Sequence, residues 1–376
     1  MKLQVEPISE GPVFFLAMVT MVAGSVYIRP NYLVKSGAPY WLLALCGMVA
    51  VAALWAYVQV RIGNLQSALV LESQMPTYAA MLQAVWGTLG FWVVGPIAFI
   101  AIIVSDCIEL WLFGSLPHTF FSPATPRYML GLTMLLPAVG LAARRLHMVA
   151  RVLQFWFPLV LRSVGCIVVG AVAHLDRLYF ITPRLLIRNM MPVQSMLGIW
   201  FMFVPESAIQ TVVAYIRNGS HLGRTSVLAT VTPGMILLLL DILVVGTLGP
   251  APTSWGEWPI VYGFSLVTIR SFFLQGAGLF ILIAWTNAMT LVLLVHLHAM
   301  SWNGDSVILT SGARRWMVLG AQASVIGVGA LALPTPIAGY RWLFGVISPV
   351  SMVLSISTTG ALCGLSLWRA RKQAQA

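Results

Sequence analysis

The sequence carries very little charge. Only 8% of its 376 residues are Asp, Glu, Lys or Arg, whereas a soluble domain carries roughly a quarter. Hydrophobic residues make up 59%, and no long polar interval interrupts the apolar runs between residues 11 and 368. This composition excludes a water-soluble globule and predicts one transmembrane domain over residues 1–376.

Cysteine is scarce and the common enzyme motifs are missing. The four cysteines lie in apolar runs without a CxxC or Cys/His spacing, so we expect buried thiols and no metal site. The sequence contains no HExxH, GxSxG or P-loop motif, which predicts neither an enzyme nor a cofactor. The start, MKLQVEPISEGP, lacks the basic region of a signal peptide, so we expect the first span to stay in the mature protein.

Ten apolar runs are long enough to cross a bilayer. A hydrocarbon core of about 30 Å needs roughly 20 apolar residues in a helix, which satisfies its own backbone groups. The qualifying runs are residues 12–29, 40–60, 88–113, 126–143, 151–174, 193–215, 226–248, 271–299, 316–334 and 341–368. The sequence therefore predicts an all-α polytopic membrane protein with about ten transmembrane helices.

The net charge of +11 lies mostly in short Lys and Arg clusters between these runs. If the N-terminus is cytoplasmic, the cytoplasmic loops hold more basic residues than the opposite side, for example at Arg144, Arg145, Arg314 and Arg315. This bias is typical of membrane topology. We therefore predict cytoplasmic termini, the lipid bilayer as a partner, and no nucleic acid.

Two connections are expected at the membrane surface. Residues 61–87 are too polar to span and predict an interfacial helix pair broken at Pro76. Residues 251–262 carry tryptophans that suit the headgroup region.

Carboxylates inside spans cost at least a few kcal/mol on insertion scales, so each is a candidate for function. Asp106 and Glu109 stand three residues apart in the third span, on one helix face. One interpretation is a polar wall that faces a cavity. The other is that this span ends early and the pair reaches the outer surface.

Two spans contain residues that weaken a helix at its middle. In the sixth span Pro205 removes a backbone donor just before Glu206. Irregular backbone at this depth is tolerated where it lines a cavity, and half-helix ends there suit charged ligands. A proline kink with Glu206 bonded to a neighbouring helix is the alternative. Gly24 and Ser25 give the first span a milder break, although such residues also serve close helix packing.

The eighth span adds polar side chains. Thr286 and Asn287 are candidates to line a pocket, with interhelical hydrogen bonding as the commoner role of such residues. His296 and His298 fall near the predicted cytoplasmic end of the span, so we expect them at the interface.

The stretch from Trp258 to Ser301 resembles the spore-germination permease-like family, the B subunit of endospore germinant receptors. Family-like elements here are Trp258-Pro259-Ile260-Val261, Ile269, Phe272 and Phe273, the start ISEGPVFFLAMVTMVAGSVYIRP, and Phe203, Pro205 and Glu206. The chain departs from the family at Ser105-Asp106, where a basic residue often precedes the acid, and at Arg270-Ser271-Phe272-Phe273, where the family has an acidic residue before the Phe pair. Ligand identity is therefore not carried over.

The resemblance implies an amino acid permease-like inverted-repeat bundle of the amino acid-polyamine-organocation superfamily. Helices 1 and 6 are expected to break around the substrate, and helices 3 and 8 to close the pocket. This places five residues at its centre: Gly24, Ser25, Pro205, Glu206 and Ser207.

The implied function is a germinant-sensing subunit that binds a small nutrient such as an amino acid. A- and C-type receptor subunits are the expected protein partners, and the spore inner membrane is the expected location. An ion- or proton-coupled amino acid permease in the cytoplasmic membrane is the alternative. A purely structural scaffold would need no polar residues at mid-membrane.

Overall fold

The computed structural model is helical, and no strand occurs among the residues it describes. These are residues 10–23, 32, 40–73, 86–120, 122–172, 191–200, 222–255, 258–265, 278–308, 312–333 and 335–375. The residues from Gly24 to Pro30 and from Phe201 to His221 lie outside these ranges. The predicted breaks of the first and sixth spans therefore stay predictions.

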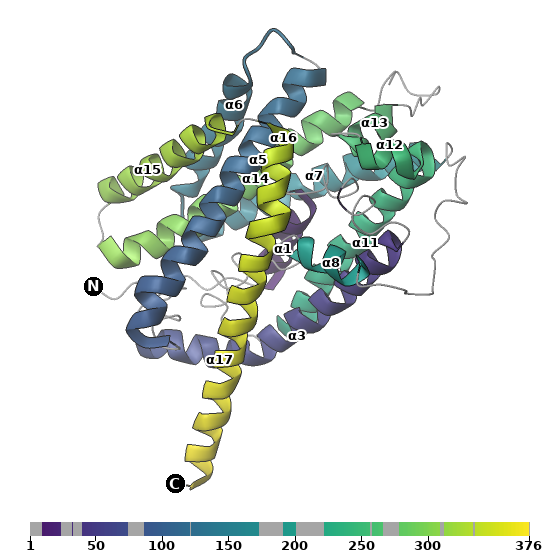
Figure 1. Cartoon of the computed structure of the whole chain (residues 1–376). Helices are drawn as coiled ribbons and strands as arrows, with labels where there is room; N and C mark the ends of the chain where they lie inside the picture. Colours follow the sequence, from purple (N-terminus) through teal and green to yellow (C-terminus); the bar gives the residue numbers. More distant parts are fainter. Residues whose placement is uncertain are drawn as a thin grey trace.

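Figure 1 shows the helices in their order along the chain. They are α1 (Glu10–Ala23), α3 (Trp41–Ser73), the π-helix η1 (Gly90–Val94), α5 (Gly95–Phe120), α6 (Arg127–Ala142), α7 (Leu146–Val172), α8 (Met191–Gly198), α11 (Leu222–Leu248), α12 (Pro250–Trp255), α13 (Pro259–Ser265), α14 (Gly278–Ile308), α15 (Gly312–Leu331), α16 (Pro336–Trp342), the π-helix η4 (Leu343–Ile347) and α17 (Ser348–Gln375).

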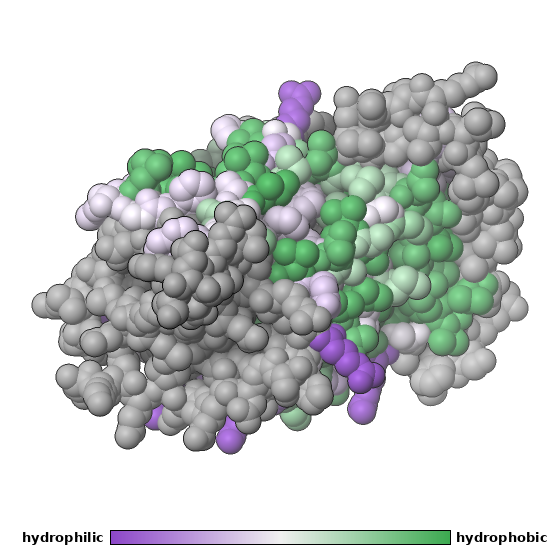
Figure 2. Space-filling view, turned by 90° about the horizontal axis from the view of Figure 1, so that it is seen from below, coloured by the Kyte–Doolittle hydropathy of each residue, from purple (hydrophilic) through white to green (hydrophobic). Residues whose placement is uncertain are grey.

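Several of these helices have the length and composition to cross a membrane. Within the described ranges the candidates are Trp41–Val58, Trp86–Phe120, Val227–Leu248 and Ala338–Leu365. Figure 2 shows one face of the molecule, on which hydrophobic side chains gather in a broad green area. The chain is an all-α polytopic membrane protein, as predicted, while the number of ten spans stays a prediction.

One group of helices packs around α11, which lies along both α3 and α1. Small residues allow the close approach of α11 and α3: a Cβ added at Gly234 would lie 2.9 Å from Cγ2 of Val49. Ala52, also on α3, is 1% exposed. Because lipid is as apolar as the side chains, association in a membrane depends on such tight packing.

The second group consists of α5, α6, α14 and α15, which pack on one another. Gly114 of α5 faces α6 so closely that an added Cβ would lie 2.9 Å from the carbonyl oxygen of Arg127. At this point α5 and α6 therefore have little room to shift against each other.

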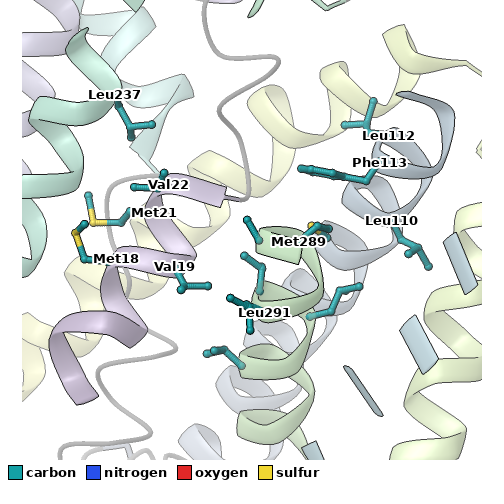
Figure 3. Packing of buried hydrophobic residues seen from close by; sticks show 14 of the residues in the cluster. Met18, Val19, Met21, Val22, Leu110, Leu112, Phe113, Leu237, Met289 and Leu291 are labelled. Carbon is teal, nitrogen blue, oxygen red and sulfur yellow. The ribbon is translucent and has the colours of Figure 1, made fainter. Parts of the chain in front are cut away.

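The two groups meet where α1 packs on α14. Figure 3 shows this contact, with the buried side chains of Val19 on α1 and of Met289 and Leu291 on α14. All three are at most 3% exposed. Helix α7 contacts both α1 and α14 and closes this side of the junction.

Helix α17 crosses the bundle in Figure 1 and projects past it to the C-terminus. It packs on α3, α8 and α5. Near its start, the Ser348 hydroxyl donates a hydrogen bond of 2.6 Å to the carbonyl oxygen of Leu197 in α8. This bond ties α17 to the described start of the predicted sixth span.

The structure differs from two surface predictions. Residues 61–73 continue α3 without a break to Ser73 and are not a separate helix, while their position at the membrane surface stays a prediction and the region around Pro76 lies outside the described residues. Trp258, expected among headgroups, is 2% exposed and belongs to the hydrophobic core. The tryptophan signal for the interface fails here because α13 packs against α11 and α14.

Candidate functional site

Helix α5 places two carboxylates inside the protein. Asp106 and Glu109 lie near the middle of α5 and are 0% and 4% exposed. The interpretation that the span ends early and the pair reaches the outer surface is therefore wrong. Both side chains lie within the bundle, where every charge needs a partner.

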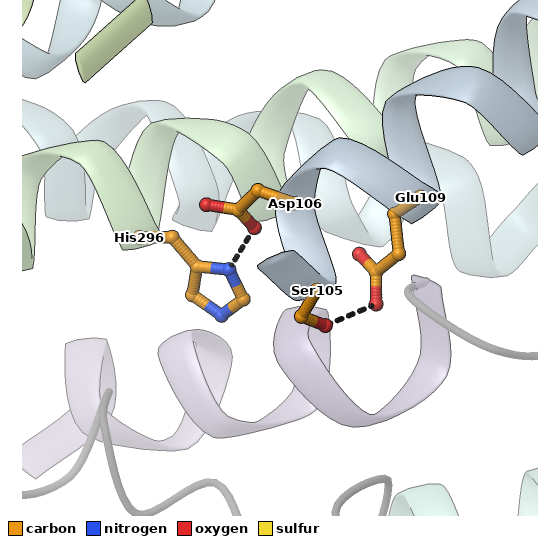
Figure 4. A network of polar contacts seen from close by, with 4 residues as sticks. All are labelled: Ser105, Asp106, Glu109 and His296. Carbon is orange, nitrogen blue, oxygen red and sulfur yellow. Dashed lines mark hydrogen bonds and ion pairs between the residues drawn. The ribbon is translucent and has the colours of Figure 1, made fainter. Parts of the chain in front are cut away.

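Asp106 finds that partner on a distant segment of the chain. Its Oδ1 lies 2.6 Å from Nδ1 of His296 on α14, and the Asp106 side chain is fully buried. Figure 4 shows the imidazole pointing from α14 at the carboxylate on α5. This distance is typical of a charge-assisted hydrogen bond. The carboxylate of α5 and the imidazole of α14 thus form a direct polar contact between the two helices.

Glu109 is bonded more weakly. The Ser105 hydroxyl, one turn earlier on α5, donates to Oε1 of Glu109 at 3.5 Å, at the long limit for a hydrogen bond. Oε2 of Glu109 and Oδ2 of Asp106 are buried and receive no hydrogen bond. Buried acceptors without donors are rare and costly. The cluster thus has acceptor capacity for an added proton, a water or a ligand cation.

His298, two residues beyond His296, has a different environment. Its Nδ1 lies 2.9 Å from the carbonyl oxygen of Ala142, the last residue of α6, and the side chain is 2% exposed. Nη2 of Arg315 donates to the same carbonyl at 3.0 Å and to that of Arg144 at 3.4 Å. A cation here is favourable because the end of a helix presents free carbonyls and negative dipole charge. His298 and Arg315 therefore hold the end of α6 against α14 and α15.

The expectation of an interface position was wrong for His296, whose imidazole contacts the fully buried Asp106 carboxylate in the bundle, and it stays a prediction for His298 at the end of α6. The predicted span 271–299 ended just beyond them, whereas α14 continues to Ile308. His296 consequently lies in the interior of its helix, at the depth of Asp106. The sequence could have indicated the buried position, because a titratable side chain inside an apolar run needs a buried partner.

Thr286 and Asn287 lie on the same helix but away from this cluster. At 1.5 Å per residue, Asn287 is about 13 Å from His296 along the axis of α14. Both side chains are half-buried, and the Thr286 carbonyl accepts a bond of 3.0 Å from the Thr290 hydroxyl. The structure brings together Asp106, Glu109 and His296, but not these two residues with them.

The remaining predicted site residues lie outside the described part of the chain: Gly24, Ser25, Pro205, Glu206 and Ser207. Among the described residues, no group of three or more His, Cys, Asp or Glu side chains is arranged to hold a metal ion.

The family model described as "Spore germination protein" matches residues 7–326. The chain belongs to this spore germination family. The resemblance identified from Trp258 to Ser301 and from the first span is thereby confirmed. Search of the curated proteins gives no match.

The fold is also found in a solved structure, that of MhsT in complex with L-phenylalanine. The two share 13% sequence identity and a TM-score of 0.66, over 93% of this chain and 89% of the other. At this identity the likeness concerns the fold. It confirms the predicted amino acid permease-like bundle as the fold of this chain.

Proposed function

We propose that this member of the spore germination family is a germinant-sensing membrane subunit that binds a small nutrient, an amino acid in the first instance. The family match supports the germination role. The whole-length likeness to MhsT, solved with L-phenylalanine, supports an amino acid as ligand. In this proposal the protein binds its ligand and performs no covalent chemistry.

The observation that carries the proposal is the open carboxylate oxygen of Glu109 at the middle of α5. Oε2 is buried without a donor, and the ammonium group of an amino acid carries three N–H donors and a positive charge. Binding there satisfies the acceptor and neutralises charge at a depth where an unpaired carboxylate is costly. Neighbouring Asp106 is already paired with His296, which leaves Glu109 as the ammonium contact.

The rest of the pocket is proposed from the sequence. Gly24 and Ser25 in the first span, and Pro205, Glu206 and Ser207 in the sixth, would supply broken-helix backbone around the ligand. A half-helix N-terminus attracts the ligand carboxylate, and freed carbonyls add acceptors for its ammonium. Thr286 and Asn287 would extend the polar lining along α14.

A sensor has to change its conformation when the ligand binds. We propose that the ligand favours one arrangement of the bundle and that A- and C-type receptor subunits respond to that arrangement. The proposed location is the inner membrane of a spore, with both termini in the cytoplasm.

An ion- or proton-coupled amino acid permease is the second candidate, favoured by the transporter-like fold. Uptake of labelled amino acid into proteoliposomes separates the two, because only the permease accumulates it.

The test is binding of L-amino acids to the full chain in lipid nanodiscs. We expect saturable binding of at least one amino acid, and at least tenfold weaker binding in Glu109→Gln, Glu206→Gln and Gly24→Leu. Thr133→Ala, at an exposed position of α6, is the control and keeps wild-type affinity. Wild-type affinity in all three site variants contradicts the placement of the pocket, and absence of binding to any amino acid contradicts the ligand class.

A further inference from the structure

The cluster of Asp106, Glu109 and His296 has more negative than positive charge when all three groups are ionised. Two carboxylates face one imidazolium, and the Asp and Glu side chains are 0% and 4% exposed. Glu109 interacts electrostatically with both Asp106 and His296. A net buried charge costs several kcal/mol in a membrane interior. One additional proton makes the cluster neutral.

We propose that Asp106, Glu109 and His296 form a proton site within the membrane domain, and that ligand binding at Glu109 releases its exchangeable proton. The first part depends only on the geometry of the cluster. The second part rests on the proposed function, because it requires an ammonium group at Glu109.

The hydrogen bonds indicate which group holds the exchangeable proton. The 2.6 Å contact between His296 Nδ1 and Asp106 Oδ1 contains one proton and is the tighter of the two. Glu109 has only the 3.5 Å contact with the Ser105 hydroxyl. A hydroxyl both donates and accepts, so Ser105 serves the ionised and the protonated form of Glu109. Glu109 therefore takes up and releases the proton, while His296 keeps Asp106 neutralised.

The other charged groups on the neighbouring helices are occupied elsewhere. Arg315 and His298 bond to the end of α6, and Cys107 on α5 points at the Val325 carbonyl of α15. The remaining described titratable side chains on α6, α7, α13 and α16 are exposed or partly exposed: Arg127, which lies over the Trp111 ring, Tyr128, His147, Arg151, Arg162, Tyr262, Tyr340 and Arg341. Among the described residues, the charged groups that act on Glu109 are His296 and Asp106.

Exchange of a proton for an ammonium group conserves the charge of the cluster. The proton leaves the Glu109 carboxyl for solvent as the cationic nitrogen of the ligand takes its place, and no covalent bond of the ligand changes. A lower pH then opposes binding because the proton competes for Glu109. Where one whole proton is released per ligand, the Kd rises about tenfold for each unit of decrease in pH, since one pH unit corresponds to about 1.36 kcal/mol per proton.

The ligand-free test is infrared spectroscopy of the full chain in lipid between pH 5 and pH 9. We expect a carboxylic acid band of a protonated buried side chain that shrinks as pH rises. The band is absent in Glu109→Gln and present in Asp241→Asn, which removes a different fully buried carboxylate. Absence of such a band from the wild-type protein at every pH overturns the proton site, whether or not an amino acid binds.

The coupling test is calorimetry of amino acid binding in two buffers with different ionisation enthalpies, which counts released protons. We expect a release of up to one proton in the wild type and none in Glu109→Gln where residual binding permits the measurement. His296→Gln shifts the pH dependence of the Kd, whereas the matched variant His298→Gln leaves it unchanged. Binding without proton release and with a pH-independent Kd overturns the coupling but leaves the proposed function intact. A titrating infrared band with no amino acid binding refutes the ligand class and leaves the proton site intact.

Discussion

Removal of the His296 side chain tests how strongly the pair with Asp106 holds α5 to α14. In His296→Leu the fully buried Asp106 carboxyl loses the donor that lies 2.6 Å from its Oδ1. Its Oδ2 already has no donor. The variant therefore has to bury an unpaired charge or keep Asp106 protonated.

Both routes give a similar cost. Breaking a buried charge pair by deletion of one partner costs about 3–5 kcal/mol. Keeping an aspartate protonated at pH 7 costs about 4 kcal/mol, because the pKa of this carboxyl in water is about 3.9. We expect a loss of about 4 kcal/mol in His296→Leu. Asp106→Leu leaves an imidazole that turns neutral at little cost, so the expected loss is about 1–3 kcal/mol, as for an unsatisfied polar group.

The double variant distinguishes pairing from packing. Hydrophobic replacement of both partners of a buried pair is often neutral or stabilising, so we expect Asp106→Leu/His296→Leu to lie within about 1 kcal/mol of the wild type. The measurement is the midpoint of reversible SDS-induced unfolding of the purified chain in mixed micelles. His298→Leu measures the cost of losing a buried imidazole from the same helix. If the losses in unfolding free energy of the two single variants simply add in the double variant, Asp106 and His296 make no coupled contribution to stability, and the stabilising role of the pair is refuted.

Two packing contacts give further predictions. Gly114→Leu forces a side chain toward the Arg127 carbonyl oxygen, 2.9 Å from an added Cβ, and should cost about 1–3 kcal/mol in the same unfolding assay. Gly140→Leu, where an added Cβ meets nothing within 4 Å, is the matched control, and equal losses contradict the close approach of α5 and α6. Ser348→Ala removes the 2.6 Å bond to the Leu197 carbonyl and should cost about 0.6 kcal/mol, and at most about 1.7 kcal/mol. Ser348→Thr should restore most of this loss, and a stability unchanged by the alanine contradicts the contribution of this bond.

The sequence indicates the buried carboxylates but not their partner. Asp106 and Glu109 were identifiable because a charge in an apolar run is conspicuous. His296 was assigned to the interface because hydropathy placed the end of the span at residue 299, whereas the helix ends at Ile308. The polar residues beyond 299 lowered the hydropathy while the backbone remained helical. Hydropathy measures apolar length and does not detect where a helix ends.

Trp258 illustrates the same limit. Tryptophan beside proline and charged residues is typical of a membrane interface, yet this side chain is 2% exposed because α13 packs on α11 and α14. A local pattern cannot distinguish burial under a neighbouring helix from burial among headgroups. Residues 61–73 likewise extend α3 even though their polarity predicted a separate segment.

The sequence by itself determined the class of protein, since 59% hydrophobic residues and 8% charged residues permit only a membrane domain. It also determined the family, through motifs that are read along the chain. Only the tertiary structure decided which polar groups meet, because Asp106 and His296 stand 190 residues apart in sequence. Their contact follows from the packing of α5 against α14, which depends on the shape of every helix between them.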